Sequence, residues 1–132
     1  MLIVVDTNVL VSALWTRNGN PAQILSLIQS RKIIPCYDCR VLQEYHEVLS
    51  RPKFGFDAWE VTDLLAQIED EGKSVIAEPL DITFTDESDR KFYEAAKHCG
   101  AYLITGNQKH FPEDEAVLSP SEFLEEYMQQ GN

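Results

Sequence analysis

The run Leu2-Ile3-Val4-Val5 at the start of the chain restricts the possible folds most strongly. It is short and β-branched and shows no alternation of apolar and polar positions, as is typical of a strand buried on both faces. Asp6 follows this run directly, and no Lys or Arg precedes Arg17. Burying an ionised carboxylate without a partner costs several kcal/mol. Asp6 therefore needs a stabilising group from elsewhere, and a metal cation is the leading candidate.

Apolar segments alternate with helical patterns along the rest of the chain. Apolar residues at three- and four-residue spacing predict helices at residues 9–14, 21–28, 40–50, 59–68, 87–98 and 119–128. Further strands are expected to begin at Ile33 and to cover residues 75–77, 102–104 and 116–118. Strands separated by helices indicate right-handed crossovers and a parallel sheet between helical layers. We predict a three-layer α/β/α fold with four to five parallel strands, as a single domain over residues 1–132.

The composition narrows the class of protein. No apolar run reaches the roughly 18 residues of a membrane span, and the N-terminus lacks the basic region of a signal peptide. We therefore expect a cytoplasmic protein without a membrane partner, and the odd number of cysteines (3) fits reduced thiols. The net charge of -11 argues against a protein that coats nucleic acid through a basic surface. It does not exclude an enzyme that holds nucleic acid through bound cations, and it suits a basic partner.

Two more acids interrupt apolar helix faces. Glu44 lies three residues after Val41 and four before Val48, so it shares their side of the helix. Asp89 lies one turn before the apolar positions of the next helix. As an alternative, Asp89 is a first-turn acid favoured by the helix dipole, or a capping group together with Asp86.

Considered together, Asp6, Glu44 and Asp89 predict a metal site. Functional groups of open parallel sheets gather beyond the carboxyl ends of the strands, where Asp6 and the segment Thr105-Gly106-Asn107 are expected. Three converging carboxylates repel one another and titrate as a coupled set, and a divalent cation removes that repulsion. Ligands that are all oxygen select Mg²⁺ or Mn²⁺ rather than Zn²⁺.

Four blocks of sequence resemble one known family. Residues 6–14, 42–54, 86–96 and 101–107 are similar, in this order, to the motifs of the PIN-domain nucleases. The second and third blocks resemble the VapC-like subgroup, the toxins of toxin–antitoxin systems. The resemblance implies a PIN-like α/β fold and Mg²⁺- or Mn²⁺-dependent cleavage of RNA, with Asp6, Glu44 and Asp89 as the catalytic, metal-binding acids. The family often has a fourth Asp where this chain has Asn107, which offers a neutral oxygen and adds no charge.

Several neighbouring residues are candidates for accessory roles. Thr105 and Ser12 are expected to orient water or phosphate, Asn8 to tie the turn at Asp6 to nearby backbone, and Asn107 to lie beside the metal ligands. The acidic Asp86 belongs to the third block. The basic residues nearest to the acids are candidate phosphate contacts, with a solvated face as the alternative: Arg90, Lys91 and Lys109.

The sequence leaves more than one function open. The first is an endoribonuclease that is the toxin of a toxin–antitoxin pair, with RNA as substrate, a basic antitoxin over the acidic site, and a homodimer formed through a face with Phe56 and Trp59. The second is a binding module with the same fold and weak or no catalysis because of Asn107. An aspartyl phosphatase is disfavoured because Asn8 stands where a second Asp is expected, and a receiver domain because the acidic pair near its first strand and its late Lys do not match here.

Cys36-Tyr37-Asp38-Cys39 has the spacing of a zinc or redox motif. No second pair of ligands exists at the spacing of a zinc site. A redox pair remains open, but small buried thiols are the favoured interpretation. His110 is expected to be a loop residue rather than a catalytic base.

Overall fold

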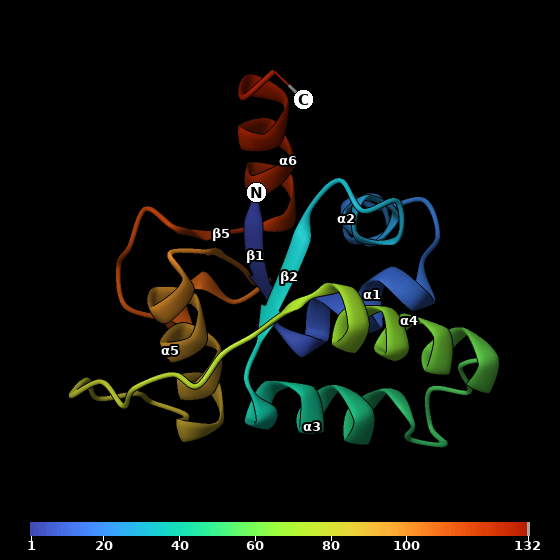
Figure 1. Ribbon diagram of the computed structural model, residues 1–132, viewed down its shortest axis with the longest axis horizontal. Coiled ribbons are helices and arrows are strands. Elements are labelled where there is room, and N and C mark those ends of the chain that lie inside the picture. The colour runs from blue at the N-terminus through green and yellow to red at the C-terminus, as the bar shows by residue number, and fades with distance from the viewer. Residues whose placement is uncertain (132) are drawn as a thin grey trace.

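The computed structural model describes residues 1–131 and has three layers, α/β/α (Figure 1). The strands are β1 (Leu2–Val5), β2 (Ile34–Tyr37), β3 (Lys73–Ser74), β4 (Tyr102–Ile104) and β5 (Val117–Leu118). The helices are α1 (Thr7–Trp15), α2 (Asn20–Gln29), α3 (Cys39–Leu49), α4 (Ala58–Glu71), α5 (Arg90–Cys99) and α6 (Pro120–Gln129). Two short 3₁₀ turns complete the described fold, η1 (Glu87–Asp89) and η2 (Gln108–His110).

All strand pairs of the sheet are parallel, in the order β3-β2-β1-β4-β5. The chain therefore builds outward from β1 to β3 and then returns to place β4 on the other side of β1. Val5 is in register with Ile104, so the residues that follow β1 and β4 come out side by side. Ligands of open parallel sheets bind at such a switch in strand order.

Helices cover both sides of the strands, as the apolar run of β1 predicts. Figure 1 shows α5 to the left of the strands and α1, α2 and α4 to the right. Helix α5 packs on β1, β2 and β4, while α4 packs on β2 and β3. Ile3, Val4 and Val5 are at most 1 % exposed. The predicted fold class is confirmed.

The third strand was predicted at the wrong residues. It lies at Lys73–Ser74, paired with Cys36 and Tyr37, rather than at residues 75–77. Val75 donates one more hydrogen bond, to the carbonyl of Tyr37 at 2.9 Å, and the chain then leaves the sheet. Ile76 is 91 % exposed, because a two-residue edge strand ends where its partner β2 ends.

The predicted helix at residues 87–98 is divided in the structure. Residues 87–89 form the 3₁₀ turn η1, and the α-helix begins at Arg90. Asp86 accepts a hydrogen bond from the amide of Ser88 at 2.9 Å and so begins the turn as a cap. This arrangement places Asp89 at the junction between turn and helix.

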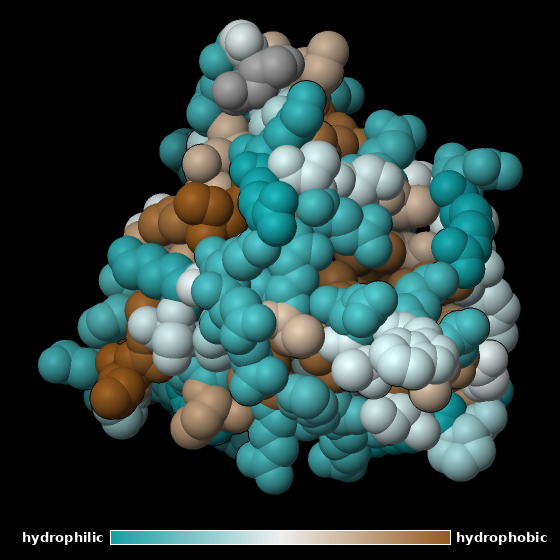
Figure 2. Space-filling model, turned by 45° about the vertical axis from the view of Figure 1, so that its right-hand side comes forward, coloured by the Kyte–Doolittle hydropathy of each residue, from teal (hydrophilic) through white to brown (hydrophobic). Residues whose placement is uncertain are grey.

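The surface carries few large apolar side chains. Figure 2 shows a face that is mostly hydrophilic, where apolar residues reach the surface in small separate areas. Trp15, Trp59 and Met128 are each more than half exposed. Among residues 1–131, none of the helices combines the length and the apolar character that crossing a membrane requires.

Candidate active site

Asp6 lies at the carboxyl end of the central strand and at the N-cap of α1. Its amide continues the sheet by donating to the carbonyl of Ile104 at 2.9 Å. The residue is only 5 % exposed, and its carboxylate makes no regular capping hydrogen bond to the first turn of α1. Burial raises the pKa of this carboxyl, which the hydroxyl of Thr105 and the amide of Asn8 offset only in part. The carboxylate of Asp6 is therefore buried at the N-terminus of α1 without a regular capping hydrogen bond.

Thr105 follows β4 and reaches Asp6 across the switch point. It is fully buried, and its hydroxyl donates to Oδ2 of Asp6 at 2.8 Å. The same hydroxyl accepts the amide of Asn107 at 3.0 Å. Because both hydrogen-bonding roles of the hydroxyl are occupied, Thr105 orients Asp6.

Glu44 lies on α3, half-buried, and two residues hold its carboxylate. The buried Thr7, next to Asp6 in sequence, donates its hydroxyl to Oε2 of Glu44. Nζ of Lys91, from α5, lies 2.8 Å from Oε1. Thr7 and Lys91 thus tie the first turns of α1 and α5 to Glu44.

Asp89 carries an unpaired oxygen. Its Oδ2 is the one buried side-chain oxygen or nitrogen of residues 1–131 that has no hydrogen-bond partner. Nδ1 of His110, on η2, lies 3.5 Å from this atom, beyond good hydrogen-bond distance. Burial and the charge of Asp86 raise the pKa of Asp89, against the opposite effect of His110 and Lys91. A buried carboxylate oxygen without a partner is costly, and its chemistry suits a cation.

The three predicted acids share one electrostatic environment. The charges of Asp89 and Glu44 both raise the pKa of Asp6, and that of Glu44 raises the pKa of Asp89. Oxygen donors of this kind fit Mg²⁺ or Mn²⁺. Within the described part of the chain, however, no three His, Cys, Asp or Glu side chains are grouped closely enough to hold a metal ion. Asp6 and the unpaired oxygen of Asp89 are donors of the kind that a divalent cation prefers, whereas Glu44 is engaged by Thr7 and Lys91.

The sequence matches a family of known proteins. The family model described as "PIN domain" matches residues 2–109. The chain belongs to the PIN-domain family. Members of this family are generally nucleases that use divalent metal ions. The chain is also 32% identical, over 141 aligned residues, to an uncharacterized protein of Methanocaldococcus jannaschii, covering 95% of this chain and 90% of that protein. No solved structure matches the chain.

The other predicted site residues of this PIN domain differ in their exposure and in their hydrogen bonds. Asn8 and Ser12 are exposed on α1. Asn8 was predicted to tie the turn at Asp6 to nearby backbone. No side-chain hydrogen bond of Asn8 is found in residues 1–131, and its backbone amide hydrogen-bonds to the carboxylate of Asp6. Asp86 is committed to the cap of η1, with its pKa lowered by the hydroxyl and amide of Ser88. Asn107 is exposed and begins η2 without a side-chain cap.

The three basic candidates also differ in how free they are. The guanidinium of Arg90 donates to the carbonyls of Leu80, at 2.7 Å, and of Ile82, and pairs with Glu87 at 2.6 Å. Lys91 holds Glu44. Lys109 is exposed on η2. Arg90 therefore already has structural partners, whereas the ammonium group of Lys109 has none among residues 1–131.

The sequence analysis did not identify two residues that contact the candidate site, Tyr45 and Thr7. It predicted His110 as a loop residue and did not predict its position beside Asp89. Tyr45 is 1 % exposed and donates its hydroxyl to the carbonyl of Val5 at 2.5 Å, directly before Asp6. Thr7 holds Glu44 from within the Asp-Thr-Asn motif. Only Thr7 gave a signal, as a polar residue between buried positions.

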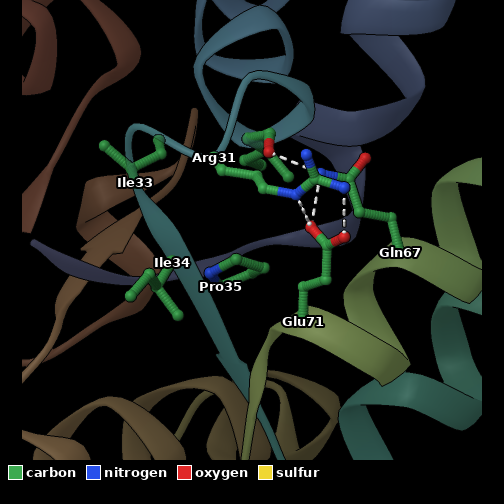
Figure 3. Close-up of a pocket in the computed structure, with 7 residues that line it drawn as sticks. Arg31, Ile33, Ile34, Pro35, Gln67 and Glu71 are labelled. Carbon is green, nitrogen blue, oxygen red and sulfur yellow. Dashed lines mark hydrogen bonds and ion pairs between the residues drawn. The ribbon is translucent and has the colours of Figure 1, made fainter.

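A cavity lies at the opposite end of β2 from the three acids, and its polar side chains are already paired. It measures about 340 Å³ and lies between the ends of α2 and α4 (Figure 3). Figure 3 shows the guanidinium of Arg31 directed at the carboxylate of Glu71, with Gln67 beside them. Oε1 of Glu71 lies 2.6 Å from Arg31, and Gln67 donates to the carbonyl of Ile28 at 2.7 Å. The polar groups of this cavity already bind one another.

The cysteine motif is divided between two structural environments. Cys36 is fully buried on β2, whereas Cys39 is exposed at the start of α3. The thiol of Cys36 interacts with Cys99 at the end of α5, and burial, together with this neighbour, raises the pKa of Cys36 to about 12. Cys36 therefore stays a thiol at neutral pH, as the interpretation of small buried thiols predicts. For Cys39 that interpretation was wrong, because this thiol is exposed.

Thiol titration checks this assignment. In the native protein a disulfide reagent at pH 7.5 is expected to modify Cys39 first and Cys36 only on unfolding, because the thiolate is the reactive form. The Cys39→Ser variant should lose the fast phase and keep the slow ones. Fast modification of Cys36 in that variant would contradict the burial argument.

Proposed function

We propose that this PIN domain is an endoribonuclease that hydrolyses RNA phosphodiester bonds with Mg²⁺ or Mn²⁺. The observation that carries the proposal is the unpaired, buried oxygen of Asp89 in the electrostatic environment of Asp6 and Glu44. The charges of Asp89 and Glu44 raise the pKa of Asp6, and the charge of Glu44 raises that of Asp89, at a topological switch point. Such an arrangement suits a cation rather than stability.

The roles of the residues follow from their contacts. Asp6 and Asp89 would hold the cation, and Thr105 keeps the carboxylate of Asp6 in place through its 2.8 Å hydrogen bond. A divalent cation at this place supplies Lewis-acid polarisation of the phosphoryl group and acidification of water. Glu44 would complete the site when the contacts to Thr7 and Lys91 rearrange. Once Lys91 is released from Glu44, its ammonium group would bind phosphate oxygens beside the acids. Arg90 and Lys109 remain candidate phosphate contacts.

The toxin role and its partners form part of the same proposal. A net charge of -11 suits a basic antitoxin segment over the acidic site. For the homodimer we propose the aromatic face, where Trp15 packs edge-on against Phe54 and Phe56 at ring distances of 5.4 and 6.1 Å. Trp59 beside this cluster is 78 % exposed. A small basic reading frame directly upstream would support the toxin role.

Cleavage of a mixed RNA pool by the purified protein tests the activity. We expect cutting in Mn²⁺ or Mg²⁺ and none in EDTA, because the cation supplies the electrophilic assistance. Metal-independent cutting would contradict the mechanism. A folded protein that binds RNA but does not cut it in either metal would favour the binding module, with the neutral Asn107 as the reason.

A further inference from the structure

Beside Glu44 lies a groove of about 410 Å³ between α3 and the start of α5. One face of α3 forms a wall with residues that recur at helical spacing, from Arg40 to Val48, and Arg51 continues this wall just after the helix. The opposite wall comes from η1 and α5. The complete lining is Arg40, Gln43, Glu44, Glu47, Val48, Arg51, Glu87, Arg90 and Lys91. Because Glu44 is both a lining residue and a proposed catalytic acid, the groove adjoins the candidate active site.

The charge of this groove differs from that of the rest of the molecule. Four basic and three acidic side chains line it, whereas the whole chain has 11 Lys and Arg against 22 Asp and Glu. The groove thus collects more than a third of the basic residues of a strongly acidic protein. A polyanion that reaches the active site meets the least repulsion along this path.

The basic residues of the groove are not equally available to a ligand. Arg40 is held by Asp38 at 2.6 Å and by Glu94 at 2.9 Å, both of them buried acids. Arg51, by contrast, lies 3.5 Å from Glu47, and both side chains are substantially exposed. Exposed pairs of this kind contribute about 0–1 kcal/mol, so Arg51 can leave Glu47 at little cost. Arg51 is the basic residue of the groove that is free to move to a phosphate.

We propose that this groove binds the backbone of single-stranded RNA next to the scissile bond, with Arg51 as the phosphate ligand. This inference rests on the proposed nuclease function. Arg51 follows Glu44 by seven residues and lies just beyond the C-cap of α3, so we expect it to contact a neighbouring phosphate rather than the one that is cut. For this groove of about 410 Å³ we expect one strand rather than a duplex as the ligand. Arg40 contributes fixed positive charge, and the exposed amide of Gln43 lies between them.

Charge reversal of Arg51, with a matched pair as control, tests the groove. Arg17 and Glu60 form a comparable exposed pair at 3.0 Å outside the groove. Binding of a labelled single-stranded oligoribonucleotide is measured by fluorescence anisotropy in Ca²⁺, and cleavage in Mg²⁺. We expect Arg51→Glu to weaken binding on the order of tenfold and to reduce the salt slope by about 0.7 for each lost phosphate contact. KM should rise by the same factor while kcat is retained.

Replacing Glu47, the ion-pair partner of Arg51, should have the opposite effect on RNA binding. Glu47→Gln should tighten binding a few-fold, because it frees Arg51 and removes a negative charge from the groove. Arg17→Glu and Glu60→Gln carry the same charge changes and should leave binding within about twofold, as exposed charges beyond a Debye length of ~10 Å are largely screened. Arg51→Ala, with an unfolding curve for every variant, separates lost contacts from misfolding.

The outcomes separate this inference from the proposed function. If the native protein cuts RNA but Arg51→Glu and Arg17→Glu change RNA binding equally, the proposal that the groove binds RNA is wrong, while the proposed nuclease function is retained. Tighter binding of duplex than of single strands would also overturn the groove. If the native protein neither binds nor cuts RNA, the proposed function fails, and the groove fails with it.

Discussion

Replacing Asp6 with asparagine is expected to abolish cleavage while the protein remains folded. The asparagine side chain keeps an oxygen that can accept the hydroxyl of Thr105, so the 2.8 Å hydrogen bond survives. It removes the negative charge that a divalent cation requires at the centre of the site. We expect kcat to fall at least about 100-fold in Mg²⁺. Single-turnover cleavage of a defined RNA measures this loss.

The same substitution should not destabilise the metal-free protein. Burial, with the charges of Asp89 and Glu44, raises the pKa of Asp6 above its ordinary value. A carboxyl with a raised folded-state pKa stabilises the fold while protonated, and this contribution is lost as pH rises through that pKa. At pH 7 ionised Asp6 therefore opposes folding, and Asp6→Asn should unfold in EDTA at the same or a higher temperature than the native protein.

An exposed aspartate provides the control for both measurements. Asp63 is exposed on α4, and Asp63→Asn should change neither cleavage nor the unfolding temperature. Full cleavage by Asp6→Asn in Mg²⁺ would remove Asp6 from the metal ligands. A markedly lower unfolding temperature in EDTA would instead make Asp6 a structural residue.

Burial patterns made most of the fold predictable. Leu2–Val5 lacks alternation because helices cover both faces of β1, and this single run indicates the layers and the parallel sheet. The apolar spacing of the helices reports the faces that they bury. The two-residue β3 carries no such pattern, because its existence depends on the free edge of β2. The apolar Ile76 was misleading for this reason.

The acids of the site were visible because each interrupts an apolar surface, but their partners were not. Glu44 meets Thr7 and Lys91 from two other helices, and Asp89 meets His110 from η2. Nothing local marks such pairs, since packing brings them together. The CxxC spacing was misleading because Cys36 and Cys39 are close in sequence but do not interact with each other. The cysteine that interacts with Cys36 is Cys99, from the end of α5.

Glu94 is the buried acid whose loss should cost the most stability. It is 2 % exposed on α5 and accepts the amide of Leu80 at 2.8 Å and the guanidinium of Arg40 at 2.9 Å. Arg90 lies 3.5 Å away. Burial alone would raise the pKa of Glu94, but these partners outweigh it and lower the pKa. The carboxylate thus anchors α3 and the irregular segment before η1 to α5.

We expect Glu94→Gln to lower the free energy of unfolding at pH 7 by about 2–3 kcal/mol, because it removes the buried charge that Arg40 and Arg90 share. Denaturant unfolding measures this loss, and the amide of Leu80 should exchange faster with solvent. Glu87→Gln is the matched control: Glu87 also binds Arg90, at 2.6 Å, but its side chain is 68 % exposed, so we expect a change of at most about 1 kcal/mol.

Acid should erase the difference between native protein and Glu94→Gln. A lowered folded-state pKa stabilises the protein above the ordinary glutamate pKa of 4.5, and this contribution disappears as pH falls through the folded value. The two unfolding curves should therefore converge on acidification. Because residues 80–82 lead into η1 and Asp89, the Glu94 variant should also cut RNA more slowly at pH 7. Equal stability of the Glu94 and Glu87 variants would show that the buried network does not anchor the segment that carries Asp89.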